Sequence, residues 1–379
     1  MDGLGQDSTM RICALVIAGA ALIGLAACGP KPAPQQAPQG ETSSPVASAV
    51  TSAMGSAIQV AQALDPCAAR GDQFAQNLCR NRSLATIDTQ IRTTLQDEVA
   101  QVSAEGAQLL VQNEERWRNA RRISCGLLDP GDQPNAQQQQ CLEGEFRARL
   151  REARNAVQRV DGYTFQRVEL LDAAPVTAAL RASSGLGDDA PPAIVREIRY
   201  PRIDQPQTPQ AERFNQLVAQ QPQYRLQEAT NETVEYRIAY AGPDIISVRF
   251  DSSADTLGAA HPSNDSKAVT VMMREGRPLQ AADVFRAGSG WEDFLTQRAV
   301  TDLTRQFKDY DFTPAASDVR ETVTKPHLWL ITENGLVLLF PPYSFGGPTA
   351  LAGTEVDIPW AELRRYLNPA APAPIRASA

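Results

Sequence analysis

The chain has 379 residues, enough for two domains of ordinary size. Apolar residues make up 42% and charged residues 21%, which is typical of a folded protein, and the net charge of −8 argues against nucleic acid as a partner. Residues 61–160 carry equal numbers of acidic and basic side chains, whereas residues 161–379 carry 28 acidic and 21 basic ones. An acidic region speeds association with a cationic partner, although solubility alone also accounts for it.

The first segment has the features of an export signal. An apolar run from Ile12 to Ala27 follows Arg11 and ends at Cys28. It is shorter than the about 20 residues that a spanning helix needs, and its basic start and small final residues are typical of a secretory signal. Its ending, Leu-Ala-Ala-Cys, resembles the bacterial lipobox. This resemblance implies removal of residues 1–27 and lipidation of Cys28. An ordinary signal peptide cut nearby, with a spare thiol at Cys28, is the alternative.

The residue after the lipobox bears on location. Gly29 stands where an Asp would indicate retention at the inner membrane. By analogy with lipoproteins, we expect a lipid anchor at the outer membrane and a chain on the periplasmic side of the envelope. Residues 28–60 are rich in Pro, Gln, Ala and Ser, and they are too poor in apolar residues to form a core. They are predicted to be a disordered tether.

Residues 61–160 are predicted to form a helical domain, because Ala, Gln, Glu, Arg and Leu dominate them. Spacings of three and four place five apolar side chains on one face of a helix with Ser83 as its N-cap: Leu84, Ile87, Ile91, Leu95 and Val99. Further helices are expected at about residues 104–124 and 137–157, joined by a loop that contains two Pro and two Gly.

Four cysteines lie in this helical region, and an even number in an exported chain implies disulfides. Cys125 and Cys141 flank the loop, where a bridge would staple a helical hairpin and contribute about 3 kcal/mol. The pair Cys67–Cys79 then follows by elimination, although other connectivities stay open. The spacings are unlike those of zinc sites and no His lies nearby, so we expect no metal and no cofactor.

The amino-acid composition changes after residue 160. Residues 161–193 include a Gly-, Asp- and Pro-rich stretch and are predicted to be a linker. Residues 194–368 contain short β-rich runs separated by turn residues, with helices expected at about 208–221, 290–307 and 360–367. This order indicates an α+β domain with a mostly antiparallel sheet. Residues 369–379 are expected to be a disordered tail.

Residues suited to catalysis are scarce. The chain has two histidines, His261 and His327, and neither lies in a zinc-binding motif. A nucleophile elbow and a phosphate-binding glycine loop are both missing from the sequence. His327 is predicted to be structural at the start of a strand. We therefore expect a protein that is not an enzyme, with a peptidoglycan-modifying enzyme as the less favoured alternative.

The helical region resembles the N-terminal domain of LprI-type lysozyme inhibitors over about residues 65–157. The matching pattern is a Cys, a second Cys before a Leu-x-x-x-Asp helix that ends at Asp88, then Trp117, Arg121 and Cys125 four residues apart, and a final Cys-Leu at 141–142. Trp117 is expected to pack in the core, and Arg121 to form an ion pair, with Asp88 as the candidate partner. The resemblance implies a lysozyme-binding or envelope role.

Residues 194–368 resemble a second family, the extracellular domain of the lysozyme-sensing anti-sigma factor RsiV, which also occurs beside peptidoglycan deacetylases. The motifs that carry the resemblance are LGAAHPSN, EGRPLQAADVF, GLVLLFPPYSFGGP and VDIPWAELRRYL. Ala259 and the stretch Ser344-Phe345 depart from the family pattern at the two loops. The resemblance implies contact with lysozyme, and we expect the contact loops around His261 and around Tyr343 to Phe345. The alternative is that Tyr343 and Phe345 cap the core.

Together these features predict a lipid-anchored envelope protein that binds or inhibits a lysozyme or another cationic muramidase. A cell-wall glycan-binding protein, with peptidoglycan as its partner, and a structural envelope lipoprotein are the alternatives. The fold predicted is a disulfide-stapled helical domain followed by an α+β domain.

Overall fold

The computed structural model describes residues 58–68, 72–187, 190–220, 225–310, 312–346 and 353–376. The signal segment, the lipobox cysteine Cys28 and most of the predicted tether lie outside these residues. Residues 58–64 are helical and Val60 is buried, so the folded part begins before the predicted end of the tether at residue 60.

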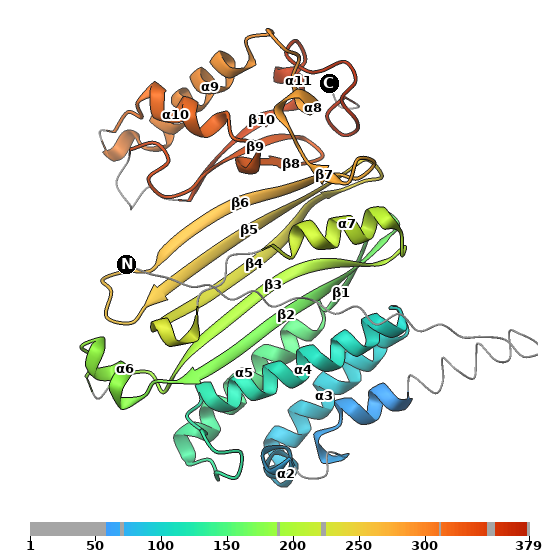
Figure 1. Ribbon diagram of the computed structural model, residues 1–379, viewed down its shortest axis with the longest axis vertical. Coiled ribbons are helices and arrows are strands. Elements are labelled where there is room, and N and C mark those ends of the chain that lie inside the picture. Colours follow the sequence, from blue (N-terminus) through green and yellow to red (C-terminus); the bar gives the residue numbers. More distant parts are fainter. Residues whose placement is uncertain are drawn as a thin grey trace, which may run out of the picture. The chain divides into compact units, whose positions relative to one another are not determined.

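The N-terminal part is a helical module (Figure 1) of α2 (Gln73–Arg80), α3 (Arg82–Val99), α4 (Ala104–Ser124) and α5 (Ala136–Ala153). The apolar face predicted for α3 is confirmed, since Leu84, Ile91 and Leu95 are buried in the core of the module. The N-cap is Asn81, whose side chain accepts hydrogen bonds from two backbone N–H groups of the first turn, and not Ser83 as predicted.

Both predicted disulfides are present in the helical module. Cys67 is bonded to Cys79, and Cys125 is bonded to Cys141, with Cα atoms 5.7 Å apart in each pair. The second bond joins the end of α4 to the first turns of α5, as the flanked loop predicts. Each disulfide reduces the conformational freedom of the unfolded chain and so stabilises the folded module.

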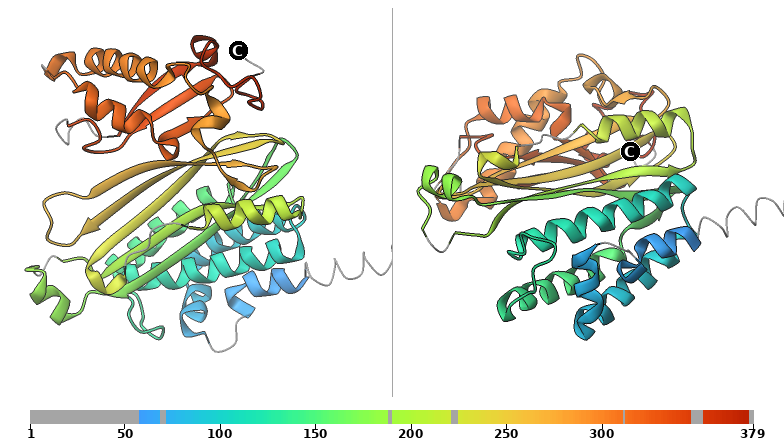
Figure 2. Two further views of the ribbon diagram at one scale, coloured as in Figure 1. Left: turned by 45° about the horizontal axis from the view of Figure 1, so that its top comes forward. Right: turned by 60° about the horizontal axis from the view of Figure 1, so that its bottom comes forward.

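A seven-stranded sheet follows, with the strands in the order of the sequence: β1 (Val157–Val160), β2 (Tyr163–Pro175), β3 (Ala193–Gln205), β4 (Thr230–Ala241), β5 (Ile245–Thr256), β6 (Ser263–Met272) and β7 (Arg277–Pro278). All neighbouring strands are antiparallel except β3 and β4. Two helices interrupt the strands: α6 (Ala178–Ser183) and α7 (Pro209–Val218). Figure 2 shows α7 lying along the sheet.

The prediction of a linker over residues 161–193 is wrong. Residues 163–175 form β2, which pairs with β3 along nearly its whole length. Residues 157–160, assigned to the helical domain from the sequence, form β1. Between β2 and β3, the described residues include α6 (Ala178–Ser183).

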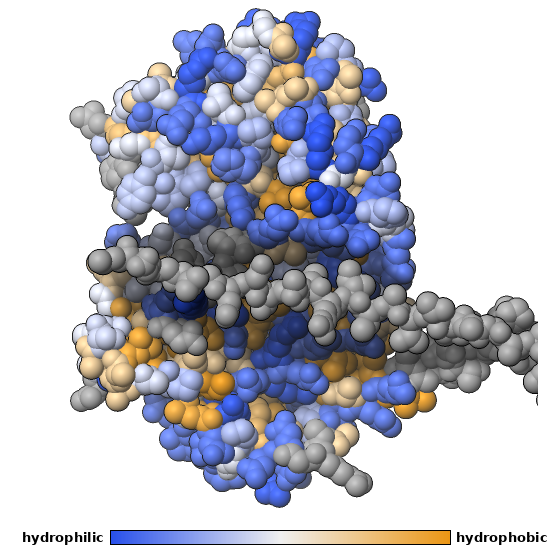
Figure 3. All heavy atoms as spheres, in the orientation of Figure 1, coloured by the Kyte–Doolittle hydropathy of each residue, from blue (hydrophilic) through white to orange (hydrophobic). Residues whose placement is uncertain are grey.

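The C-terminal part adds a three-stranded sheet of β8 (Trp329–Ile331), β9 (Gly335–Phe340) and β10 (Thr354–Pro359). Its described residues also form four α-helices: α8 (Ala281–Val284), α9 (Trp291–Gln306), α10 (Ala316–Val323) and α11 (Trp360–Leu363). The face of α9 and α10 seen in Figure 3 is mostly hydrophilic. Ile331 of β8 donates its backbone N–H to Ser247 Oγ of β5 at 3.1 Å, which connects the two sheets. The predicted disordered tail is partly wrong, because Ala371 and Ile375 are buried in this core.

The predicted fold class is confirmed: a disulfide-stapled helical region precedes an α+β part with mostly antiparallel strands. Among the described residues, no helix is both long and apolar enough to cross a membrane.

Candidate functional site

The turn after β9 presents an exposed aromatic residue in a strained backbone conformation. The side chain of Tyr343 is 65% exposed and its φ is 65°, in the left-handed region that favours glycine. A bulky residue held in this region costs of order 1–3 kcal/mol, and such strain clusters at functional sites. Thr322 of α10 donates its hydroxyl to the carbonyl of Ser344 at 2.6 Å, which fixes the turn against a helix.

Phe345 occupies the opposite environment, two residues further on. It is 2% exposed and packs against a group of aromatic rings, with centroid distances of 5.7 to 5.9 Å: Phe307, Phe312 and Phe340. The prediction that Phe345 is a contact residue is therefore wrong, since its ring anchors the turn in the core. Of the two aromatic residues of this turn, Tyr343 is therefore exposed and Phe345 is buried.

Tyr343 borders a cleft of about 410 Å³, which we call the Tyr343 cleft. Its walls come from the start of β6, from α10, from residues 325–328 and from the turn at 341–344. Charged and titratable side chains of both signs line it: Asp265, Lys267, Asp318, Glu321, Lys325 and His327. Among the described residues, no group of three or more His, Cys, Asp or Glu side chains is placed to hold a metal ion.

Two basic side chains of the Tyr343 cleft have lowered pKa values. Burial lowers the pKa of Lys267, against the opposing effect of Asp265. Burial also lowers the pKa of His327, and Lys325 lowers it further. His327 lies in the 3-10 turn just before β8, close to the predicted strand start. The cleft therefore combines basic side chains of lowered pKa with exposed carboxylates beside an exposed tyrosine.

His261 lies on the turn between β5 and β6 and is exposed. Its Nδ1 lies 3.1 Å from the carbonyl of Pro262. It stands outside the residues that line the Tyr343 cleft, although Asp265 of the same hairpin belongs to them. The structure thus brings the hairpin that carries His261 to the Tyr343 turn without bringing the imidazole into the cleft.

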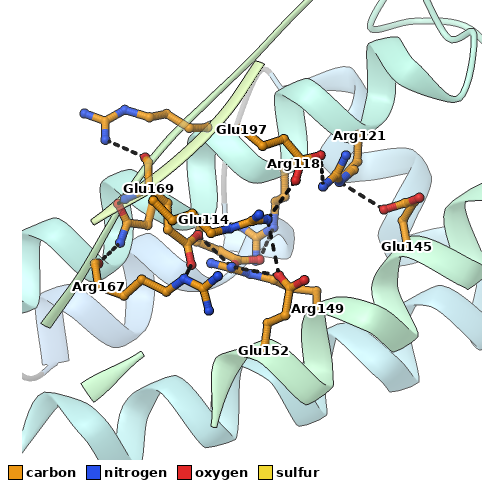
Figure 4. A network of polar contacts seen from close by, with 12 residues as sticks. Glu114, Arg118, Arg121, Glu145, Arg149, Glu152, Arg167, Glu169 and Glu197 are labelled. Carbon is orange, nitrogen blue, oxygen red and sulfur yellow. Dashed lines mark hydrogen bonds and ion pairs between the residues drawn. The ribbon is translucent and has the colours of Figure 1, made fainter. Parts of the chain in front are cut away.

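A second polar constellation, not foreseen from the sequence, joins the helical module to the sheet (Figure 4). Arg149 of α5 donates to Glu114 of α4 at 2.9 Å and to Glu169 of β2 at 2.7 Å. All three side chains are at most 3% exposed. Burial alone would raise the pKa of Glu169, but Arg149, Arg167 and Arg199 outweigh it and lower this pKa.

Arg121 belongs to the same network. It pairs with Glu145 of α5 at 3.0 Å and with Glu197 of β3 at 2.6 Å. The predicted pair of Arg121 with Asp88 is wrong, because Asp88 pairs with Arg92 and Arg118. The prediction for Trp117 is confirmed: it is 1% exposed, and its ring centroid lies 4.8 Å from that of Phe146. Of the residues that carry the resemblance to LprI-type domains, Arg121 thus links the helical module to the sheet, while Trp117 and Asp88 make their contacts inside the module.

Comparison with known proteins identifies the C-terminal part. Residues 282–361 match a family described as "Protein of unknown function (DUF3298)". This DUF3298 region begins in α8 and ends in α11, so it includes β8 to β10 and the Tyr343 turn. A DUF3298 domain is therefore present within the predicted residues 194–368. The likeness to the RsiV extracellular domain and the likeness of the helical module to LprI-type domains stay predictions. No curated protein matches the chain.

Two solved structures of DUF3298 proteins are similar to this chain. One, from Bacteroides fragilis NCTC 9343, is 14% identical, with a TM-score of 0.41, and the match covers 58% of this chain and 98% of that one. The other, from Pseudomonas aeruginosa PAO1, is 15% identical, with a TM-score of 0.40, and covers 55% of this chain and 96% of that one.

Proposed function

We propose that this protein is a non-enzymatic, lipid-anchored envelope protein that binds and inhibits a cationic muramidase of the lysozyme type through the Tyr343 turn. The observation that carries the proposal is the turn itself. An exposed tyrosine is held in a strained conformation by a buried neighbour, Phe345. Exposed aromatic residues on a rigid support make effective interface anchors, because they lose little conformational freedom on binding.

Charge supports a cationic partner. Residues 161–379 carry 28 acidic and 21 basic side chains, a net charge of −7. Opposite charges accelerate the encounter of two proteins, and salt suppresses this acceleration. The association rate should therefore fall as ionic strength rises from 0.01 M to 0.15 M, because the Debye length shortens from about 30 Å to about 8 Å.

Calorimetry of the full chain with hen egg-white lysozyme, together with an assay of lysozyme activity, tests the proposal. We expect Tyr343→Gly to lower the affinity at least tenfold and to leave the stability equal or higher by about 1 kcal/mol, since glycine relieves the strain at positive φ. Phe345→Ala should instead destabilise the fold by about 3–5 kcal/mol.

The control is Leu128→Ala, which removes another exposed apolar side chain, in the loop between α4 and α5, and should leave binding unchanged. Failure of the folded wild-type chain to bind lysozyme at low salt would refute the proposal. So would equal affinities of wild type and Tyr343→Gly, because the turn would then have no part in binding.

The anchor is tested separately from binding. If Cys28 carries the lipid, Cys28→Ala should move the protein from the membrane fraction of bacterial cells to the soluble periplasmic fraction, because lipid chains supply the membrane affinity. A Cys13→Ala variant is the matched control, since it also removes a cysteine from the leader. Unchanged membrane association of Cys28→Ala would contradict the lipobox assignment.

A further inference from the structure

A groove of about 970 Å³ lies between α4 and α7, and we call it the α4–α7 groove. The cross-strand pair of Val168 on β2 and Tyr200 on β3 contributes to its floor. Residues of α4 and of the segment 207–219, which includes α7, form its walls. Its volume is near the upper end of the about 300–1,000 Å³ typical of small-molecule sites.

The walls of the groove present side-chain amides. Gln108 and Gln112 lie one helical turn apart on α4, so they project from the same face of the helix. Both are exposed, and neither side chain has a hydrogen-bond partner among the described residues. Gln207 and Gln216 line the opposite side. A side-chain amide has two N–H donors and a carbonyl acceptor, and the carbonyl of Gln216 already accepts a hydrogen bond from Arg213 at 3.0 Å. The groove can therefore both donate and accept hydrogen bonds.

The groove is preformed because buried polar contacts hold both walls. On one side, Asp204 of β3 accepts hydrogen bonds from the backbone N–H and the hydroxyl of Ser103, both at 2.6 Å, at the N-terminus of α4. On the other side, the amide of Asn215 on α7 bonds the backbone N–H and carbonyl of Ile203, at 2.7 and 3.0 Å. These contacts fix the backbones of the two walls, so the spacing of the groove is set before a ligand enters.

The charged residues that line the groove limit the kind of ligand that it can bind. The cation that lines the groove, Arg202, already pairs with Glu105 at 2.8 Å and with Asp204 at 3.0 Å. Glu212 adds a further carboxylate to the lining. Among the described lining residues, an anionic ligand would thus find no unpaired cation, and a buried anion without a partner is strongly disfavoured. The groove is therefore unsuited to an anion, and its side-chain amides favour a ligand that can both donate and accept hydrogen bonds.

We propose that the α4–α7 groove binds a neutral oligosaccharide chain. Hydroxyl and acetamido groups along such a chain would exchange hydrogen bonds with the four glutamines. The apolar faces of the sugar rings would contact Tyr200 and Leu109, which are part of the apolar lining of the groove and are half-buried. This ligand goes beyond the muramidase proposal and uses none of the residues of the Tyr343 turn.

Titration calorimetry of the full chain with tetra-N-acetylchitotetraose, a neutral probe, tests this inference. The double variant Gln108→Leu/Gln112→Leu removes the two amides of α4 while keeping side chains of similar size. We expect it to lower the affinity at least tenfold without a change in thermal stability, because neither amide supports the fold. Gln90→Leu, at an exposed position on α3, is the matched control and should bind like wild type.

Three outcomes would overturn the inference. The wild-type chain could fail to bind the tetrasaccharide at millimolar concentration. The double variant could bind it as tightly as wild type does. A neutral extended peptide could bind in the groove where the sugar does not, which would make it a peptide site. Tyr343→Gly should leave oligosaccharide binding intact, so failure of the muramidase proposal and failure of this one can be told apart.

Discussion

Arg149 forms a buried ion pair between the helical module and the sheet. Its guanidinium bridges Glu114 and Glu169, and it lies 5.5 Å from the ring centroid of Trp117. Replacing a buried ion pair by apolar groups can be neutral, but removing one partner leaves an uncompensated buried charge. Without this arginine, the buried carboxylates of Glu114 and Glu169 would each lose an ion-pair partner.

We predict that Arg149→Met destabilises the fold by about 3–5 kcal/mol at neutral pH, measured by urea unfolding. Methionine keeps an apolar stem, so the loss reports the charge rather than the packing. Arg147→Met, two residues away on the same helix, is the control. Arg147 is 59% exposed and pairs with Glu143, and its loss should cost at most about 1 kcal/mol. Equal losses of stability in the two variants would show that the buried ion pairs of Arg149 stabilise the fold no more than the exposed pair of Arg147.

The ion pair between Arg149 and Glu169 should also make the stability of the fold depend on pH. Because the folded-state pKa of Glu169 is lowered, its ion pairs contribute stability above the ordinary glutamate pKa of about 4.3, and this contribution is lost as the pH falls. The stability difference between wild type and Arg149→Met should thus be largest at neutral pH and shrink in acid. A difference that stays constant down to the acid transition would contradict this account.

At the scale of elements, α4 protects an edge of the sheet. β1 pairs with β2 only as far as Gln166, so the following backbone of β2 has no neighbouring strand on that side. Asn113 of α4, which is 3% exposed, donates to the carbonyl of Arg167 at 2.8 Å and accepts from the N–H of Glu169 at 3.2 Å. Arg116 adds a bond to the carbonyl of Glu169. One helix side chain thus bonds the backbone as a strand would, and a covered edge does not recruit other chains.

This arrangement explains which elements could be predicted from the sequence. The helices α3 and α4 have an apolar spacing or a composition that predicts them, and β3 to β6 lie in the region predicted to contain short β-rich runs. β2 was missed because Arg167 and Glu169 interrupt its apolar pattern. Their partners come from α5, β3 and β4, and no local pattern shows them.

The candidate site, too, could be predicted only in part from the sequence. The sequence singles out the turn with Tyr343 and Phe345, but two aromatic residues two positions apart give no sign of which one is buried. The backbone decides it: a positive φ at Tyr343 directs that side chain outward, while Phe345 enters the aromatic cluster. The α4–α7 groove could not be predicted either, since its walls lie about a hundred residues apart in sequence.

At the scale of the whole molecule, the helical module and the seven-stranded sheet depend on one another. The ion-pair network, the Asn113 contacts and the bond from Asp204 to the start of α4 all cross between them. Leu171 and Ala173 of β2 belong to the apolar core of the helical module. Residues 58–376 therefore do not divide at the boundary near residue 193 that the sequence indicated.

We therefore predict that a fragment of residues 190–379 does not unfold cooperatively, as measured by circular dichroism during heating. Without β2, the fragment leaves β3 at an open edge and exposes Ile194 and Ile198, which are fully buried in the full chain. The fragment 157–379 is the matched comparison, because it restores β1 and β2 but not the helices. If only 157–379 unfolds cooperatively, the missing strand explains the failure. If neither fragment does, the helical module is needed as well. A cooperative transition of residues 190–379 near that of the full chain would show instead that the C-terminal part is an independent domain.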